Sequence, residues 1–302
     1  MIEPEPEAAP EIGEVRAAEA APVLRDPGLM TSPAAPAAPG RAAVMGTYRT
    51  DGQRKKANRR ALELAIEQRP LTPAEQMEVA AYSGEGGIEA SLNQFWTHPD
   101  VAKAAWDLMA KHGFKGGNVL EPAVGAGVFI ETAPAGASMT GVELDQDVAE
   151  ISQALHGHES AIYNQSFEQF SVAGEGVREK FDAVVTNAPF VTRGDGTVYD
   201  HKPHIRSADK YFLDTALDHV KPGGLVAMIV HSNVMTGGDG DFRQRMMERG
   251  ELVDAIRLPG QVWKNAGTGV TADLILLRKR PGKAEVTDER VRDGHFFTDN
   301  PE

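Results

Sequence analysis

The stretch "NVLEPAVGAGVF", residues 118–129, decides the fold that we expect for this chain. An apolar run ends in Glu-Pro, a turn containing Gly125 and Gly127 follows, and a short apolar helical pattern then begins. A strand that turns through glycines into a helix opens an α/β sheet, and glycines there let the backbone approach a ligand closely. The third glycine of the dinucleotide fingerprint is missing, so a plain tight turn is the alternative interpretation.

Outward from this stretch, short apolar runs alternate with helical patterns. This alternation predicts a doubly wound, Rossmann-like α/β fold whose sheet is mostly parallel. The further strands are expected at residues 138–145, 160–167, 181–190 and 223–232, and the helices at 98–113, 146–157, 208–220 and 240–250. A final antiparallel hairpin is expected within residues 261–279.

Composition divides the chain into four parts. Residues 1–45 are rich in Ala, Pro and Glu, which predicts a disordered tail, because such a segment buries too little apolar surface to offset its ordering entropy. Residues 46–90 are expected to form a preface of short helices, and residues 91–281 the main domain. A polar tail is expected at residues 282–302.

Charge and residue usage exclude several kinds of site. The 302 residues contain no Cys, which excludes disulfides, thiolate nucleophiles and Cys-based zinc sites and fits a cytoplasmic protein. No apolar run is long enough to span a membrane. The net charge of −13 argues against tight nonspecific binding to nucleic acid. The basic cluster at residues 54–60 is interpreted as a solvated helix face, with a local nucleic-acid contact as the alternative.

Polar residues stand where the first three strands are expected to end. Glu121 would face a ligand crevice, where a carboxylate suits an ammonium group. Glu143 ends the next strand, where open α/β sheets hold a ribose diol. Ser166 and Phe167 follow the third strand and are placed to flank an adenine ring. A solvated strand end and an ordinary loop are the alternatives for these positions.

The stretch "TNAPFV", residues 186–191, ends the fourth expected strand. The side-chain oxygen of Asn187 can accept one hydrogen of an exocyclic amine, and the carbonyl of Ala188 can accept the other. Together they would hold the nitrogen lone pair toward an electrophile. Phe190 can stack on a flat heterocycle. The alternative is an Asn-initiated turn with Pro189 at its third position.

These motifs resemble, in their order, those of the AdoMet-dependent DNA adenine-N6 methyltransferases. The series is "NQFWTHPDVA", "EPAVGAGVF", "GVELD", "NQSF" and "NAPF", with the cofactor motifs before the catalytic motif, as in the gamma arrangement. The resemblance covers roughly residues 82–280, and its later part is similar to the methylase part of helicase–methyltransferase proteins of phages and mobile elements. It implies direct methyl transfer from S-adenosyl-L-methionine (AdoMet) to N6 of an adenine flipped out of DNA.

The resemblance also implies a role for each site residue, and no metal. The catalytic loop would consist of Asn187, Ala188, Pro189 and Phe190. The residues expected to bind AdoMet are Phe95, Thr97, Glu121, Pro122, Gly125, Gly127, Glu143, Leu144, Ser166 and Phe167. Among them, the first two would contact the methionine end, Glu121 the amino group and Glu143 the ribose.

Two departures from the family pattern bear on activity. Ala188 stands where Pro is usual, which predicts a slower but active enzyme, and an Ala188→Pro variant that is neutral or mildly activated. No target-recognition domain follows the sheet, so selectivity would be low, or would come from residues 191–207 or from a protein partner. We expect that loop to approach DNA phosphates, as could Trp263 and Lys264. Its basic and imidazole side chains are Arg193, His201, Lys202, His204 and Arg206, and a metal site formed by the two histidines is the alternative.

Two other classes of function stay open. One is a noncatalytic or weakly active module of the same fold within a larger phage or mobile-element assembly, which the acidic charge and Ala188 favour. The other is methylation of an amide or amine of protein or RNA, because the Asn-X-Pro-aromatic loop also serves those reactions. For a phage-encoded chain, the expected location is the host cytoplasm.

Overall fold

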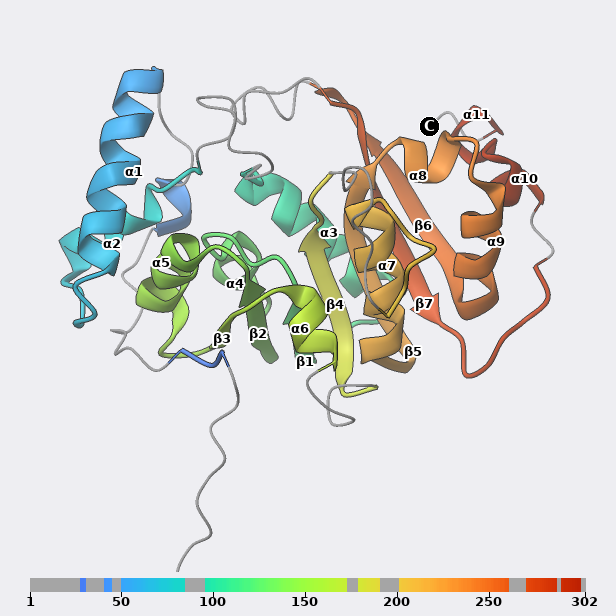
Figure 1. Ribbon diagram of the computed structural model, residues 1–302, viewed down its shortest axis with the longest axis horizontal. Helices are drawn as coiled ribbons and strands as arrows, with labels where there is room; N and C mark the ends of the chain where they lie inside the picture. Colours follow the sequence, from blue (N-terminus) through green and yellow to red (C-terminus); the bar gives the residue numbers. More distant parts are fainter. Residues whose placement is uncertain are drawn as a thin grey trace, which may run out of the picture.

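A seven-stranded sheet forms the centre of the protein. The computed structural model describes residues 28–30, 41–44, 50–84, 96–172, 179–190, 201–260, 270–286 and 289–299. The strand order is β3-β2-β1-β4-β5-β7-β6 (Figure 1). The first five strands of the chain run parallel, whereas β7 is antiparallel to both of its neighbours. The predicted doubly wound α/β fold with an antiparallel end is thereby confirmed.

The strand bounds place the site-forming residues at one edge of the sheet. The strands are β1 (Gly117–Glu121), β2 (Ala137–Glu143), β3 (Ala161–Asn164), β4 (Phe181–Asn187), β5 (Val220–His231), β6 (Gly250–Leu258) and β7 (Ala272–Lys279). The order along the sheet reverses between β1 and β4. In open α/β sheets, ligands bind outside the carboxyl ends of the strands at such a reversal.

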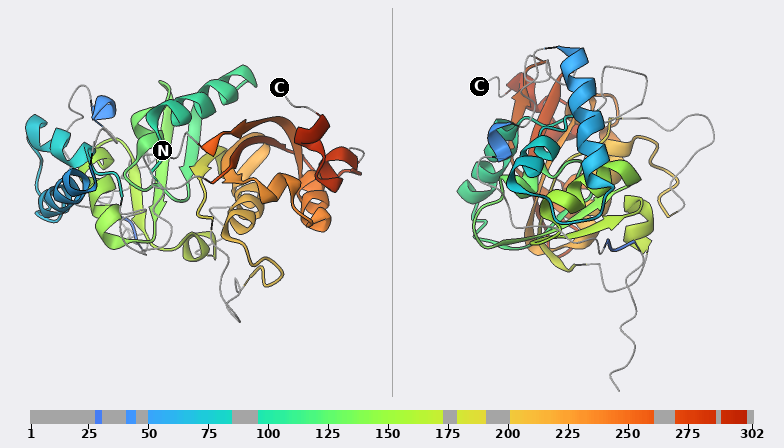
Figure 2. Two further views of the ribbon diagram at one scale, coloured as in Figure 1. Left: turned by 90° about the horizontal axis from the view of Figure 1, so that it is seen from above. Right: turned by 90° about the vertical axis from the view of Figure 1, so that its left-hand side faces the viewer.

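Helices cover both faces of the sheet. Alternate residues of a strand point to opposite faces; in β4, Val184 joins one apolar cluster while Ala183 and Val185 join the other. The first cluster contains side chains of α6 (Phe167–Val172), α7 (Ala208–His219) and α9 (Gly240–Arg249). The second contains side chains of α3 (Pro99–Lys111) and α4 (Val128–Glu131), on the opposite face (Figure 2).

A third apolar cluster joins the N-terminal helices to the sheet. Helices α1 (Asp51–Ala65) and α2 (Pro73–Ala80) pack against α5 (Gln146–His156), which itself packs on β2 and β3 (Figure 1). Thr72 and Glu75 form a capping box at the start of α2, as expected of a Thr-Pro helix start. Among the described helices, none is long and apolar enough to cross a bilayer.

Two short segments within residues 1–45 pack on the domain, which corrects the expectation of a disordered tail at these positions. Met30 N donates to Ile162 O at 2.8 Å, so residues 28–30 extend the β3 edge of the sheet. Arg41, in the 3-10 turn η1 (Arg41–Ala43), is 1% exposed and pairs with Glu131 at 2.7 Å.

The antiparallel end of the sheet differs in detail from the expected hairpin. The partner of β7 is β6, with Gly250 opposite Lys279 and Leu258 opposite Ala272. The antiparallel pair at the end of the sheet is therefore confirmed in its second strand, β7, whose partner is β6. Residues 261–269, and Trp263 and Lys264 with them, lie outside the described residues.

Helices also occur where a polar C-terminal tail was expected. The short helices α10 (Glu289–Asp293) and α11 (Phe296–Asp299) lie beside α8 (Asn233–Thr236) and α9 (Figure 1). Val291 is buried in the first apolar cluster. The buried guanidinium of Arg243 donates to the carbonyl of Arg292 at 2.9 Å. These contacts tie residues 289–299 to the main domain.

Candidate functional site

The carboxyl ends of three parallel strands bring together residues that are distant in sequence. Glu121, Glu143 and Asn187 are the last residues of β1, β2 and β4. Because β2, β1 and β4 are consecutive in the sheet, the three side chains belong to one edge, at the reversal of strand order. The loops that follow these strands therefore lie at the same edge of the sheet.

Glu121 carries a buried carboxyl group, one oxygen of which has no partner in the described part of the chain. Its side chain is 1% exposed, and its Oε2 atom has no hydrogen bond among the described residues. Burial raises the pKa of Glu121 well above its usual value, and the nearby Glu143 raises it further. An unpaired buried carboxylate is energetically costly, and a cationic ligand group would remove that cost. The ammonium group of a methionine moiety has the required charge and donors.

Glu143 holds the glycine turn in place. Its Oε2 accepts the backbone N–H of Gly125 at 2.9 Å, and its Oε1 accepts that of Asp145 at 3.0 Å. Burial raises the pKa of Glu143, while these backbone donors act in the opposite direction. Asp145 caps α5 by accepting Val148 N at 3.2 Å. Glu143 thus shapes the turn, a role that the sequence did not indicate.

The two glycines of the turn meet different surroundings. Both have left-handed φ angles, +54° at Gly125 and +82° at Gly127. A Cβ atom on Gly125 would have nothing within 4 Å, whereas one on Gly127 would lie 2.4 Å from the ring of His156. Gly125 therefore borders open space that a ligand can use, and Gly127 is required for the packing of α5 against the turn.

Asn187 presents an unpartnered oxygen at the carboxyl end of β4. Its Nδ2 donates to Thr97 Oγ1 at 3.0 Å, and its buried Oδ1 has no hydrogen bond among the described residues. Thr97 is 5% exposed and lies just before α3. By accepting from the amide nitrogen, the Thr97 hydroxyl orients the Asn187 oxygen as the free acceptor. Thr97 was expected at the cofactor, and its contact with Asn187 was not foreseen.

Ala188 is joined to the sheet by its backbone. Its N–H donates to Ile229 O at 3.2 Å, which continues the pairing of β4 with β5 by one residue. Proline has no N–H and could not make this bond. Pro189 follows Ala188, whereas after β1 the proline, Pro122, comes directly after Glu121.

Phe190 lies beside His231, which the sequence did not indicate as a site residue. Its ring meets that of His231 edge-to-face, with centroids 6.0 Å apart. The backbone N–H of His231 donates to Oδ2 of the buried Asp209 at 3.3 Å, and the Ser207 hydroxyl also donates to Asp209. The available signal was His231 itself, a polar residue at the end of an expected strand on the same edge.

Ser166 and Phe167 have structural contacts of their own. Ser166 Oγ accepts Gln169 N at 3.0 Å while Gln169 Oε1 accepts Ser166 N at 3.0 Å, a reciprocal cap at the start of α6. Phe167 is 4% exposed and its ring packs 4.9 Å from that of Phe212. This burial leaves no open ring face at Phe167 for an adenine. Leu144, next to Glu143, is instead 72% exposed.

The described part of the loop after Phe190 corrects one expectation. Lys202 is buried and pairs with Asp214 and Asp218, so it is not free to meet a DNA phosphate. His201 Nε2 lies 2.9 Å from the hydroxyl of Tyr211. His204 and Arg206 are exposed. Among the described residues, no group of three or more His, Asp or Glu side chains could hold a metal.

Two expected site residues, Phe95 and Arg193, lie outside the described residues. Their predicted roles stay predictions. Trp96, which follows the first of them, has a buried indole N–H with no hydrogen bond among the described residues.

Comparison with known proteins identifies sequence relatives. The family model of the N-6 DNA methylases matches residues 88–300. "Defense against restriction protein B" of Escherichia phage P1 is 35% identical over 239 residues, 77% of this chain and 10% of that protein. "Modification methylase CviBIII" of Paramecium bursaria Chlorella virus NC1A is 32% identical over 127 residues, 39% of this chain and 32% of that protein. The chain thus spans about a tenth of the length of the first relative and about a third of the length of the second.

Solved structures share the fold. The methyltransferase subunit of a type I restriction-modification system from Streptococcus thermophilus matches with a TM-score of 0.55 and 19% identity, over 76% of this chain and 58% of that one. A chain of a type I restriction-modification complex matches with a TM-score of 0.53 and 18% identity, over 69% of this chain and 48% of that one. At these identities the likeness concerns the fold alone.

Proposed function

Because this chain belongs to the N-6 DNA methylase family, we propose that it transfers a methyl group from AdoMet to the N6 amine of an adenine in DNA. The observation that carries the proposal is the Asn187 side chain. Its oxygen is buried, has no hydrogen-bond partner among the described residues, and is held in orientation by Thr97 at the carboxyl end of β4. An acceptor placed in this way suits an exocyclic amine, which has two hydrogens to donate and whose lone pair must point at the methyl group that it receives.

The residues of the catalytic loop would position the base. Asn187 Oδ1 and the carbonyl of Ala188 would each accept one N6 hydrogen, which leaves the nitrogen lone pair directed at the methyl group. As the bond to N6 forms and the bond between the methyl group and sulfur breaks, N6 would become more positive, and the two oxygens would stabilise that charge until one N6 proton is lost to solvent. Phe190 would stack on the adenine after it leaves the duplex, since the target atom cannot be reached inside the base stack.

AdoMet fits the other side of the crevice. Glu121 would bind its ammonium group, and the open space at Gly125 would let it lie against the turn. Leu144 is the exposed apolar side chain beside Glu143 and would cover the adenosine. The cofactor supplies an activated methyl group on sulfur, and the chain's own residues bind and orient the two reactants.

Incubation with labelled AdoMet tests the proposal. The parent should label adenine-containing DNA, and Asn187→Ala should lose on the order of 100-fold or more in rate while retaining AdoMet affinity. Asn118→Ala, an exposed asparagine at the opposite end of β1, is the matched control and should label DNA like the parent. Label on RNA or protein but not on DNA would show that the substrate is RNA or protein and not DNA.

A noncatalytic module is the second candidate function. Two observations favour it: the net charge of −13, and a phage relative of which this chain spans only 10%. In that case the protein would act in the host cytoplasm within a larger assembly, and a partner would supply DNA recognition. This candidate would be supported if the parent binds AdoMet but transfers no label to DNA, RNA or protein, whether or not the partner is present.

A further inference from the structure

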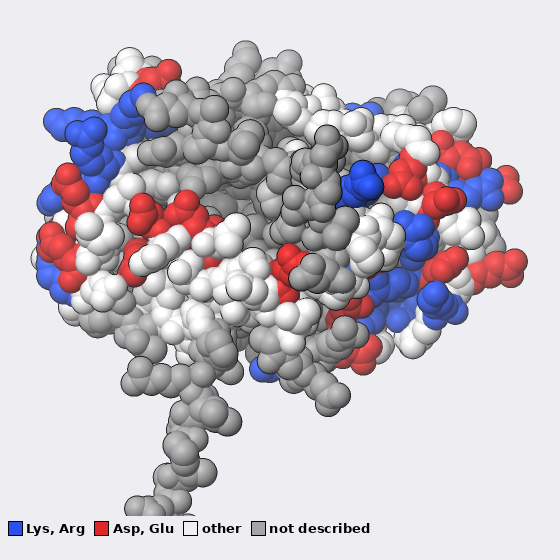
Figure 3. Space-filling view, viewed as in Figure 1, with Lys and Arg blue, Asp and Glu red and all other residues white. Residues whose placement is uncertain are grey.

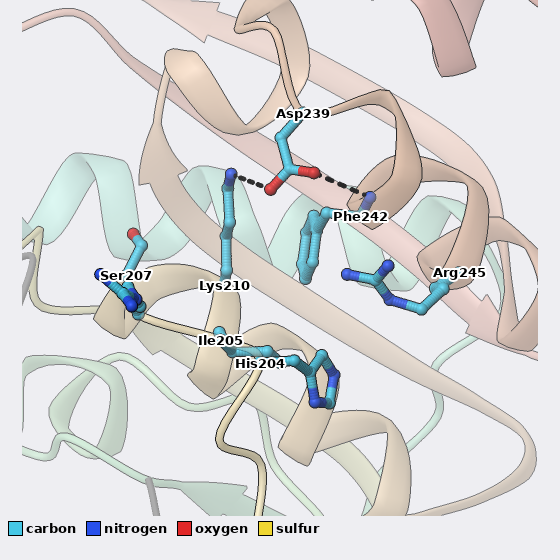
Figure 4. A pocket seen from close by; sticks show the side chains of 8 residues that line it. His204, Ile205, Ser207, Lys210, Asp239, Phe242 and Arg245 are labelled. Carbon is cyan, nitrogen blue, oxygen red and sulfur yellow. Dashed lines mark hydrogen bonds and ion pairs between the residues drawn. The ribbon is translucent and has the colours of Figure 1, made fainter. Parts of the chain in front are cut away.

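A cationic pocket lies between the beginnings of α7 and α9. Its volume is about 250 Å³. The lining residues are His204, Ile205, Arg206, Ser207, Lys210, Asp239, Phe242 and Arg245 (Figure 4). The buried Phe242 contributes an apolar wall, with Lys210 Nζ 5.3 Å from the centre of its ring.

The pocket holds three cationic side chains, those of Arg206, Lys210 and Arg245, and one anionic side chain, that of Asp239. Asp239 is already engaged, because it accepts Lys210 Nζ at 2.7 Å and caps α9 by accepting Phe242 N at 3.1 Å. The side chains of Arg206 and Arg245 are exposed, and neither has a hydrogen bond or ion pair within the described part of the chain. The two guanidinium groups are thus available to an anion.

The pocket adjoins the catalytic loop through one buried carboxylate. Asp209 lies between the pocket residues Ser207 and Lys210 and accepts the N–H of His231, whose ring touches Phe190. An anion held in the pocket would therefore be linked, through Asp209 and His231, to the loop that is proposed to receive the base.

We propose that this pocket binds a backbone phosphate of the DNA strand that carries the target adenine. The inference rests on the proposed function and names a contact surface for the same substrate. Arginine matches phosphate through paired N–H donors, and phosphate contacts set the register of a protein on DNA without reading its sequence.

The distribution of charge favours this ligand. At a net charge of −13 the molecule as a whole repels DNA, so binding requires local cationic sites. Figure 3 shows Lys and Arg gathered at two places on this face, over α1 and on the right-hand part of the molecule. The pocket is the cationic site that adjoins the catalytic loop.

The experiment measures binding of a fluorescent adenine-containing oligonucleotide by the full chain, in the presence of AdoMet, across a series of salt concentrations. Arg245→Gln and Arg206→Gln are the test variants, both at exposed positions. Lys115→Gln, an exposed position before β1 at the opposite edge of the sheet, removes the same charge and is the control. AdoMet binding by each variant reports that the fold is intact.

Each test variant should bind the oligonucleotide several-fold more weakly than the parent, and the slope of log affinity against log salt should fall by about 1. The control should keep the parent's slope. Unchanged affinity and slope in both test variants would overturn the pocket assignment while the proposed function stands, provided that the parent still methylates DNA. A parent that neither binds nor methylates DNA would overturn both.

Two further arms separate other ligands of the same chemistry. Inorganic phosphate is the first of these ligands. If it binds the parent but not Arg245→Gln and does not weaken oligonucleotide binding, the pocket is a site for free phosphate and the assignment to a DNA backbone phosphate is overturned. An acidic peptide tests for a protein partner instead. That partner would be assigned to the pocket if the peptide competes with the oligonucleotide for the parent and competes more weakly for Arg245→Gln, while both proteins bind DNA with equal affinity.

Discussion

At the scale of single residues, Glu121 links cofactor binding to pH. Its pKa is raised mainly by burial and secondarily by Glu143, so the folded protein without ligand favours the protonated form. The contribution of Glu121 to folding stability is fully present below its unfolded pKa of about 4.3 and is lost as pH rises through the raised pKa. Binding of an ammonium group needs the opposite, charged form.

Glu121→Gln should therefore have opposite effects on stability and on binding. The variant should melt at a higher temperature than the parent at pH 8, and the difference should shrink toward pH 4, where the parent carboxyl is protonated as well. Its AdoMet affinity should be far below that of the parent, whose affinity should rise with pH. Calorimetric melting and AdoMet titration at several pH values measure both; a parent melting temperature above that of the variant at pH 8 would contradict the argument.

Gly125 and Gly127 form a matched pair, because both have positive φ and differ in what surrounds them. Gly125→Val should abolish AdoMet binding, since the added side chain would occupy the open space, and its left-handed φ should cost some stability as well. Gly127→Ala should lower stability more strongly, because its Cβ would collide with His156. Thermal melts and AdoMet calorimetry on both variants would separate the roles; equal AdoMet affinity in Gly125→Val and the parent would remove the turn from the cofactor site.

Ala188→Pro should impair the enzyme, contrary to the expectation from sequence. The change removes the N–H that donates to Ile229 O, at a cost of about 0.5–1.5 kcal/mol in unfolding free energy. The lost bond also anchors the backbone next to Asn187, so the methyl-transfer rate should fall. Denaturant melts and rate measurements check this, with Ala188→Gly as a control that keeps the N–H. A more active and equally stable proline variant would show that the bond is dispensable.

At the scale of elements, an ion cluster joins α7 to α9 and to the loop before α7. Asp214 and Asp218, one turn apart on α7, both bind Lys202 from the loop and Arg249 at the end of α9. Two acidic and two basic side chains balance there with little exposure. Through Lys202 the cluster holds the loop before α7, which leads into the cationic pocket.

Lys202→Gln should lower the free energy of unfolding by about 2 kcal/mol. Loss of one partner of a fully buried pair costs about 3–5 kcal/mol, and the partial exposure of these carboxylates reduces the effect. Urea unfolding should show a lower midpoint with an unchanged m-value. Lys103→Gln, at an exposed position on α3, is the control and should unfold like the parent. Equal midpoints for both variants would mean that the cluster adds no stability.

At the scale of the whole molecule, the N-terminal segments contribute to the domain. Arg41 is buried against Glu131, and residues 28–30 bond to β3. Deletion of residues 1–45 should thus lower the melting temperature relative to deletion of residues 1–27, by about 2–4 °C for each kcal/mol lost. The two truncations differ by the contacts of Arg41 and of residues 28–30, so identical melting temperatures would show that these contacts carry no net stability.

Much of the architecture follows from the sequence by itself. The order of strands and helices, the glycine turn after β1 and the Asn-X-Pro-Phe turn after β4 are all set by neighbouring residues. Apolar periodicity, caps and turn chemistry act over a few residues, and parallel strands must share their carboxyl edge. For this reason the local patterns alone suffice to assign Glu121, Glu143 and Asn187 to one edge of the sheet.

Only the tertiary structure decided which distant groups meet. The bond from Asn187 to Thr97, the contact of Gly127 with His156 and the pairing of β6 with β7 join residues that no local pattern connects. The burial of Phe167 and of Lys202 was likewise set by the elements that close over them. Such pairings depend on the free energy of packing the whole chain, because a buried polar or aromatic group takes whichever partner the fold brings within reach.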